Sequence, residues 1–421
     1  MKLTHRSKEI ITQLINKGVQ IPCPESIEVG DEINSQKISG EGVIIHTGCK
    51  LYGADTLIMD GVELGYEAPA TIHNCQLGND VKLKGGAFSD SSFLDKASIG
   101  SGAQIREACL FEEGAHGGHN VGLKQTILFP YVTLGSLINF CDCLMAGGTD
   151  EKNHSEVGSS YIHFNYTPNQ DKATASMLGD VPRGVMINQK PIFLGGQGGL
   201  VGPLRIAYGT IIAAGTIARK DILKEDTLLL GHPAIVKSIP FTKGRYSNLK
   251  RIITLNSYYI SSILTLRRWY IDVRLMFTVS GSMAESLLKG AIDKLDKAID
   301  ERIKRLNQVA QNMTQSIKLF RAEGSAKGHF LNKCQEFHDQ WPAIEQVFQK
   351  SKEMRGDSSN RESFLEIIEN KIHINGKNYL EVIKGLDHQE SQTGTSWLQG
   401  LINAINKQVW ELLPGLNIKG V

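Results

Sequence analysis

The sequence predicts a parallel β-helix built from hexapeptide repeats, followed by an α-helical region. Three observations predict this fold class: an aliphatic residue recurs at every sixth position, glycine is concentrated before residue 241, and all four tryptophans lie after it. An aliphatic residue followed by glycine or another small residue suits a short strand and a tight turn. Stacked hexads bury their aliphatic side chains in one continuous prism that a single repeat could not form.

Composition excludes several classes of protein. The 421 residues carry 46 basic and 44 acidic side chains, so the formal net charge is only +2. This balance offers no electrostatic surface for nucleic acid, and ordinary hydrophobicity argues against disorder. The seven cysteines contain no Cys-x-x-Cys pair, which favours reduced thiols over disulfides or a zinc site. No apolar segment is long enough to span a membrane, and we expect a cytoplasmic protein.

The predicted elements follow one another in three regions. Residues 1–30 are expected to form an N-terminal helix and a lead-in, because apolar residues fall on one helical face. Residues 31–237 are expected to form the β-helix, since a β-sandwich would instead alternate with period two. The clearest hexads are headed by Ile99, Ile105, Phe111, Leu194, Leu200, Ile206 and Ile212. The six-residue phase is lost at about 149–190, which predicts an inserted loop where a site could be placed.

Residues 238–421 are expected to be α-helical. Residues 283–321 contain no proline, and their apolar positions step by three or four, which predicts one long helix. This helix could pack within its own domain or form a coil between subunits. The segment 372–376 is expected to be strand-like, and the region shows no catalytic motif.

Two segments resemble a known family. PIFLGGQGGLVGPLRIAYGTIIAAGTI, residues 191–217, and AQIREACLFEEGAH, residues 103–116, resemble the acetyltransferase domain of the bacterial bifunctional enzyme that makes UDP-N-acetylglucosamine. The resemblance covers residues 95–236, about a third of the chain. It implies a left-handed coil, a homotrimer with sites between neighbours, acetyl-CoA as co-substrate without a metal, and a sugar phosphate or nucleotide sugar as acceptor.

The resemblance also implies roles for individual residues. Those implied to bind the acceptor are Arg106, Lys124, Asn165, Tyr166 and Lys172. Those implied to bind acetyl-CoA are Gly196, Ala214 and, in the sequence Gly-His-Pro-Ala, His232. Arginine would hold a phosphate with two parallel hydrogen bonds and lysine as a point charge. Singly, each cation could equally be a solvated surface charge.

The catalytic histidine of the family falls on Ser136, so the base must come from elsewhere. His154 and His163 lie in the segment where the phase is lost, and histidine is the usual base because it titrates near neutral pH. We expect His154 to take the proton, with Glu156 orienting it; the alternative is a solvent-facing loop residue. For His163 the alternative is a side chain packed like an aromatic residue.

Three functions are compatible with the sequence. The first is an acyl-CoA-dependent acyltransferase acting on an amino sugar phosphate or nucleotide sugar. The second is a scaffold that binds a sugar nucleotide without catalysis, which the loss of the family histidine would explain. The third is a nucleotidyltransferase, because proteins that resemble this chain across most of its length are often labelled UDP-N-acetylglucosamine pyrophosphorylase. The roughly 30 residues before the first coil are too few for the nucleotide-binding domain that this reaction needs.

Overall fold

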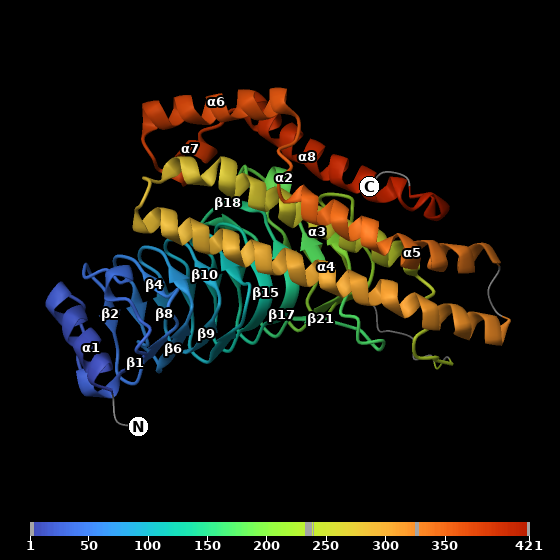
Figure 1. Ribbon diagram of the computed structural model, residues 1–421. Helices are drawn as coiled ribbons and strands as arrows, with labels where there is room; N and C mark the ends of the chain where they lie inside the picture. Colours follow the sequence, from blue (N-terminus) through green and yellow to red (C-terminus); the bar gives the residue numbers. More distant parts are fainter. Residues whose placement is uncertain (1–3, 232–237, 239, 325–327, 419–421) are drawn as a thin grey trace.

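The computed structural model describes residues 4–231, 238, 240–324 and 328–418 (Figure 1). Helix α1 (His5–Lys17) packs on the first coil of a β-helix and buries Ile10, Ile11 and Leu14. The Thr4 hydroxyl accepts a hydrogen bond from the Ser7 N–H at its start. Gly18, with a φ of 112°, ends the helix in a left-handed conformation that favours glycine. The apolar face of α1 thus closes the open end of the solenoid core.

The β-helix has about eleven turns and three faces of parallel strands. Face 1 consists of β2 (Ile44–Ile45), β5 (Glu63–Leu64), β8 (Lys82–Leu83), β11 (Ser98–Ile99), β14 (His116–Gly117), β16 (Thr133–Leu134), β20 (Glu156–Val157), β23 (Phe193–Leu194), β26 (Ile211–Ile212) and β28 (Leu228–Leu229). Short 3₁₀ turns, η1 (Pro24–Ser26) and η2 (Ser35–Lys37), precede it. The predicted fold class, a left-handed parallel β-helix followed by an α-helical region, is confirmed.

The other two faces share the long strands β15 (Gly122–Leu128) and β17 (Asn139–Met145), which bend from face 2 onto face 3. Face 2 also has β1 (Glu28–Val29), β3 (Lys50–Tyr52), β6 (Ala70–His73), β9 (Gly86–Ser89), β12 (Ala103–Ile105), β21 (Ile162–Phe164), β24 (Gly199–Val201) and β27 (Ile217–Ala218). Face 3 also has β4 (Leu57–Ile58), β7 (Gln76–Leu77), β10 (Ser92–Phe93), β13 (Leu110–Phe111), β22 (Ser176–Leu178) and β25 (Arg205–Ile206). We name the edges of the prism after the faces they join: edge 1–2, edge 2–3 and edge 3–1.

Hexad-heading aliphatics fill the prism as the six-residue period predicts. Ile99, Leu194 and Ile212 point inward from face 1, and Ile105 and Leu200 do so from face 2, each at most 1% exposed. Parallel pairing stacks each side chain about 4.8 Å above its equivalent in the previous coil. The interior is therefore a column of like apolar side chains.

The six-residue period is lost at 149–190, but not because of the single inserted loop that the sequence predicts. The coil continues through β20, β21 and β22, and Glu156 stacks on Thr133 and below Phe193. Three excursions leave it: a hairpin of β18 (Gly148–Asp150) and β19 (Asn153–His154) at edge 3–1, residues 165–175 at edge 2–3, and α2 (Val181–Gly184) at edge 3–1. Each adds residues between inward positions, so the sequence period fails although the prism does not.

Helices α3 (Leu249–Asp272) and α4 (Met283–Glu323) lie along face 3 of the β-helix (Figure 1). Helix α4 contacts β7, β10 and β13, and α3 contacts β22. The outward side chains of face 3, which would otherwise be in water, are consequently buried. The remaining elements are η3 (Arg274–Phe277), α5 (Gly328–Ser351), α6 (Ser358–Asn375), α7 (Tyr379–Lys384), α8 (His388–Glu411) and η4 (Pro414–Leu416).

The apolar side chains on one face of α4 are buried against other elements of the same chain. Its residues Leu295, Ile303 and Val309 are buried between the solenoid and helices α3 and α5. The strand expected at 372–376 is wrong: those residues end α6, whose Phe364 packs on Trp269 and Trp397. Within the described ranges, none of the helices combines the length and apolar character needed to cross a membrane.

Candidate functional site

Arg106 and Lys124 lie side by side at edge 2–3. The register of β12 on β15 stacks Ile105 on Leu123, so the next residues, the two cations, are one coil apart. Lys124 Nζ lies 2.6 Å from Glu107 Oε1, and Arg106 reaches along the edge to within 4.0 Å of Cys141 Sγ. Burial opposes the ionisation of Glu107, but Lys124 holds the pKa of that carboxyl below its ordinary value. The edge thus carries two cationic side chains whose backbones are one coil, about 4.8 Å, apart, an arrangement that suits contact with a phosphate group.

The segment 165–175 leaves the coil at the same edge, after β21. Asn165 Oδ1 accepts a hydrogen bond of 2.9 Å from the Thr174 hydroxyl, which holds the segment in its loop conformation. Tyr166 is 68% exposed, and Lys172 is exposed. All five residues predicted to bind the acceptor therefore lie along edge 2–3, within a few coils of one another.

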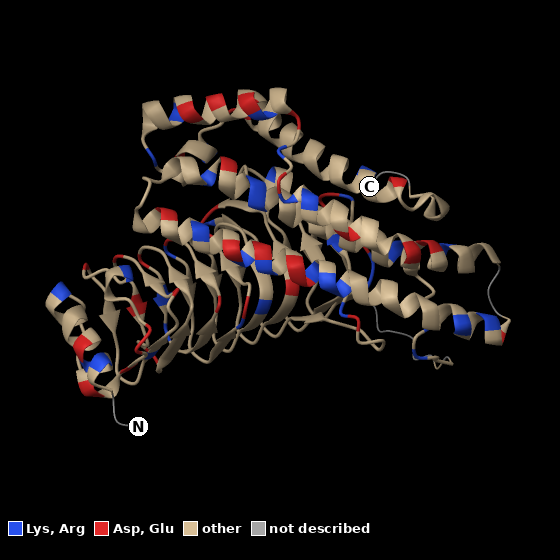
Figure 2. Ribbon diagram, viewed as in Figure 1, with Lys and Arg blue, Asp and Glu red and all other residues tan. Residues whose placement is uncertain are grey.

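Arg302 of α4 ties this loop to the coils beneath it. Its Nη2 lies 2.8 Å from Asp142 Oδ1 and donates to Gln125 Oε1 at 2.7 Å, and its Nη1 donates to the Lys172 carbonyl at 3.2 Å. Figure 2 shows acidic and basic residues alternating along α4. Arg302 thereby fixes Lys172 relative to the coil of Lys124.

A second column of residues runs along edge 1–2. The register of the face 1 strands stacks His116 on Thr133 and Thr133 on Glu156. Three residues further along each coil, the column at the edge reads His119, Ser136, Ser159, Gly196 and Ala214. Gly196 and Ala214, two of the residues predicted to bind acetyl-CoA, thus share an edge with the position of the family histidine.

The last coils offer room for a donor at this edge. A cavity of about 850 Å³ is lined by residues 213–222 and 229–231, including Ala214 and the exposed cations Arg219 and Lys220. A Cβ added at Gly195 would lie 2.3 Å from the Ala214 nitrogen, so these coils approach as closely as only glycine permits. His232, also predicted to bind acetyl-CoA, lies outside the described residues.

His154 lies at edge 3–1 and belongs to neither column. It ends the hairpin at edge 3–1, and its Nδ1 lies 2.8 Å from the carbonyl oxygen of Glu151 in the same hairpin. Arg106 and Lys124 lie at edge 2–3, across the whole width of face 3, which α3 and α4 cover. In the described part of the chain no hydrogen bond joins Glu156 to His154. The structure therefore does not bring the predicted base to the predicted acceptor residues.

His163 occupies an inward position of face 2, where neighbouring coils carry Phe140 and Leu200. Its side chain is 4% exposed, its Nε2 lies 2.8 Å from Ser176 Oγ, and its ring meets Phe140 edge-on at 6.4 Å. Burial lowers its pKa to about 4. This placement fits the packed alternative, so we leave His163 out of the proposed reaction.

Replacing His163 by leucine is expected to remove a loss of folding stability that the wild type shows at acidic pH. The folded-state pKa is depressed, so the stability that the neutral ring supplies is complete above about pH 6.5 and is lost as pH falls towards 4. Ser176 keeps the Leu204 N–H as a partner. We expect His163→Leu to unfold in urea like the wild type at pH 8 and to be about 2 kcal/mol more stable at pH 5. The exposed His5→Leu is the control, and the same pH dependence in all three proteins would contradict a buried neutral ring.

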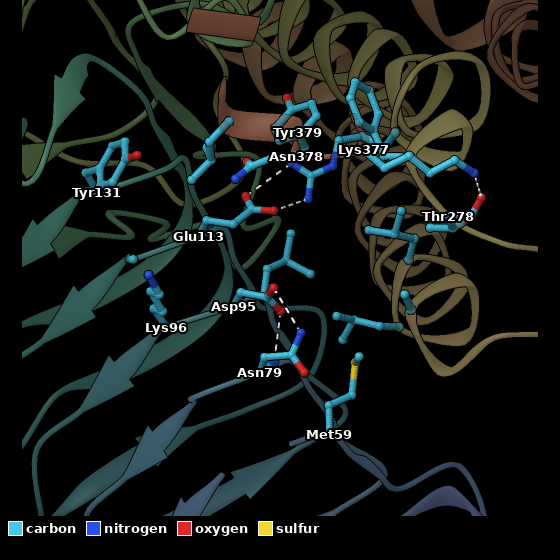
Figure 3. A pocket seen from close by; sticks show the side chains of 18 of the residues that line it. Met59, Asn79, Asp95, Lys96, Glu113, Tyr131, Thr278, Lys377, Asn378 and Tyr379 are labelled. Carbon is cyan, nitrogen blue, oxygen red and sulfur yellow. Dashed lines mark hydrogen bonds and ion pairs between the residues drawn. The ribbon is translucent and has the colours of Figure 1, made fainter. Parts of the chain in front are cut away.

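One pocket lies away from all predicted residues, between edge 3–1 and the helical region (Figure 3). Its volume is about 500 Å³, and charges of both signs line it, among them Asp95, Lys96 and Lys377. Asp95 accepts hydrogen bonds from Asn79, and burial raises the pKa of that carboxyl. Within the described residues, no cluster of three or more histidine, cysteine or carboxylate side chains could hold a metal ion.

One candidate functional residue that the sequence did not indicate is His119, which lies beside Glu67 at edge 1–2. His119 Nδ1 lies 3.5 Å from Glu67 Oε2. The 17-residue spacing from His119 to Ser136, close to one coil, could have pointed to His119. Its partner Glu67 could not be found in this way, because it lies in a loop 52 residues earlier.

No family model matches the chain. Among curated proteins it is similar to the bifunctional protein GlmU of Thermotoga petrophila, at 25% identity over 213 residues, which are 50% of this chain and 42% of the relative. The bifunctional protein GlmU of Lawsonia intracellularis is 28% identical over 214 residues, 51% of this chain and 41% of the relative. The chain thus spans less than half the length of these relatives.

Among solved structures, LpxA from Acinetobacter baumannii aligns with 66% of this chain and 95% of its own, at 14% identity and a TM-score of 0.20. The similarity to GlmU is the informative comparison, because it is detected from sequence and covers half of the chain. It confirms the predicted resemblance of this chain to the hexapeptide-repeat acyltransferases.

Proposed function

We propose that the chain is an acyl-CoA-dependent acyltransferase that acetylates an amino sugar phosphate or a nucleotide sugar. The observation that supports this most is the arrangement of two columns at opposite edges of face 2. Cations for an acceptor phosphate line edge 2–3, and the positions matching acetyl-CoA contacts line edge 1–2. An acceptor lying across face 2 would have its phosphate at Arg106 and Lys124 and its nucleophile near the donor.

The reaction needs three contributions from the chain. Arg106 and Lys124 hold the phosphate, and the glycine-rich turn at Gly196 lets the donor approach the backbone. The acceptor amine or hydroxyl attacks the thioester carbonyl, a base takes its proton, the C–S bond breaks, and the proton passes to the leaving thiolate. Holding both substrates on one rigid face supplies orientation without a further conformational change.

The same proposal includes a homotrimer in the cytoplasm. The covered face 3 is unavailable to a neighbour, whereas faces 1 and 2 carry exposed apolar side chains near their last coils. These side chains are Ile162, Phe193, Ile211, Ile217 and Leu228. Pairing gives Phe193 and Ile211 one ladder on face 1, which favours an association with other copies through these two faces.

Calorimetric titration with acetyl-CoA tests the proposal, followed by thiol release with a panel of amino sugar phosphates and nucleotide sugars. We expect saturable acetyl-CoA binding and acceptor-dependent thiol release. Binding of a sugar nucleotide without any acyl-CoA binding would instead favour the scaffold. Magnesium-dependent turnover of UTP by the isolated chain would favour the nucleotidyltransferase.

Removing either cation at edge 2–3 is expected to weaken acceptor binding. A hydrogen bond to a charged group contributes about 1.5–3 kcal/mol, so Arg106→Ala and Lys124→Ala should each raise the acceptor KM roughly 10- to 100-fold. The affinity for acetyl-CoA should stay within about twofold, because the donor edge is untouched. Lys82→Ala, an exposed lysine on face 1, is the matched control. An unchanged acceptor KM in both variants would remove the phosphate site from the proposal.

A further inference from the structure

We propose that His119, oriented by Glu67, is the base that takes the proton from the acceptor nucleophile; this inference rests on the proposed function. The position that matches the family histidine is Ser136, which cannot act as a base at neutral pH. His119 lies one coil earlier in the same column, so the base would have moved along the solenoid axis rather than been lost.

Coil stacking places His119 within reach of the atoms that a base at position 136 would contact. The backbone N–H of His119 donates a hydrogen bond of 3.2 Å to the Ser136 hydroxyl, which fixes the two positions against each other. One coil is about 4.8 Å, less than the length of a histidine side chain plus a hydrogen bond. The imidazole is 57% exposed at edge 1–2, so a substrate on face 2 can approach it.

Glu67 and Ser101 both lie at the Nδ1 side of the His119 ring, and the Ser101 hydroxyl is 3.4 Å from Nδ1. Glu67 belongs to the loop after β5, and its Oε2 lies 3.5 Å from His119 Nδ1 and accepts a hydrogen bond from the Ser101 N–H at 3.3 Å. Its Oε1 lies 3.1 Å from Lys84 Nζ. Hydrogen bonds from Ser101 and Lys84 lower the pKa of Glu67, so the carboxylate is charged at neutral pH. A carboxylate at Nδ1 keeps the ring proton there and leaves Nε2 free to accept another.

Face 2 is open between His119 and Lys124, which lie at the two ends of one coil segment. The outward residue between them is Gly122, and a Cβ added there would meet only the Ile138 carbonyl, at 4.0 Å. On the two neighbouring coils, the residues that stack on Gly122 are Gln104 and Asn139. The small Gly122 leaves space on this face for an acceptor with its phosphate at Lys124 and its amine or hydroxyl at His119.

Other histidines are placed less well for this step. His154 faces edge 3–1, and His163 lies inside the prism. His116 Nδ1 lies 2.7 Å from the Ser98 hydroxyl on face 1. His46 is paired with Glu63 at 3.0 Å, four coils before His119.

The proposed step balances without any further reactant. As the acceptor nitrogen or oxygen bonds to the thioester carbon, its proton moves to His119 Nε2. When the C–S bond breaks, the imidazolium returns that proton to the thiolate sulfur. Coenzyme A leaves as the thiol, and His119 is neutral again.

The test compares full-length wild type with His119→Asn, Glu67→Gln, His154→Asn and, as control, the exposed His388→Asn. With the acceptor that the wild type acetylates, His119→Asn should lower kcat roughly 100- to 10,000-fold. Its affinity for acetyl-CoA, measured by calorimetry, should stay within about twofold, and its melting temperature should not change. The control should keep the wild-type kcat.

Glu67 is a positioning residue, so its test needs a readout that a structural role would not move. Glu67→Gln should lower kcat less than His119→Asn does and leave the acceptor KM unchanged, and the conservative Glu67→Asp should recover part of the lost kcat. Full kcat in His119→Asn, or a loss confined to His154→Asn, would overturn the inference while the acyltransferase stands. A wild type that neither binds nor consumes acetyl-CoA would overturn both, before any variant is made.

Discussion

Replacing Arg302 by methionine is expected to lower the free energy of unfolding by about 3–5 kcal/mol, the cost typical of breaking a buried ion pair from one side. The Arg302 side chain is 3% exposed and that of its partner Asp142 is 6% exposed. Burial raises the pKa of Asp142, and Arg302 opposes this shift. Without the guanidinium, Asp142 is left without its counter-charge in the interior, and Gln125 and the Lys172 carbonyl lose a donor.

Urea unfolding of full-length proteins measures this loss. Arg305→Met is the matched control, since Arg305 lies three residues further along α4 and pairs with Glu301 within the same helix; we expect it to cost less than about 1 kcal/mol. In Arg302→Met, Asp142→Asn should recover much of the loss, because no charge remains buried alone. Because Arg302 also holds Lys172, the acceptor KM should rise in Arg302→Met. Equal losses of unfolding free energy in the two arginine variants would contradict a distinct stabilising role for Arg302.

Ionisation of one buried carboxyl, Glu112, is expected to remove about 3 kcal/mol of stability between pH 4.5 and 7, a contribution opposite in sign to that of His163. The Glu112 side chain lies at edge 3–1 and accepts a hydrogen bond of 2.5 Å from the Tyr270 hydroxyl. Arg274 is nearby, but it pairs with the adjacent Glu113. Burial therefore raises the pKa of Glu112 to about 7, with Arg274 opposing and Glu113 adding to the shift.

The sign follows from the raised pKa. The folded state binds the Glu112 proton more tightly than the unfolded chain, so the stabilisation is complete below about pH 4.5 and is lost as pH rises through 7. Glu112→Gln cannot ionise and should be about 3 kcal/mol more stable than the wild type at pH 8, with little difference at pH 4.5. Urea unfolding at pH 4.5, 6, 7 and 8 measures this, with the exposed Glu156→Gln as control. A Glu112→Gln protein no more stable at pH 8 would refute the buried neutral carboxyl.

The sequence by itself determined the solenoid, because its signal is local and repeated. An aliphatic residue at every sixth position, such as Leu194, Leu200, Ile206 and Ile212, must point inward in any regular coil of this period. Arg106 and Lys124, 18 residues apart, lie on neighbouring coils because the turn between them has no insertion. The helical character of residues 238–421 was equally local, because it follows from a step of three or four.

Only the tertiary structure decided which residues share an edge. Successive coils differ in length: Ser98 stacks on Lys82, 16 residues earlier, whereas Phe193 stacks on Glu156, 37 residues earlier. Excursions of unknown size break the sequence count, so His154 could not be assigned to edge 3–1 or His163 to the interior. Glu67 meets His119 only because a loop after β5 spans several coils. Helices α3 and α4 cover face 3 through contacts between residues far apart in the chain, and no local period encodes such contacts.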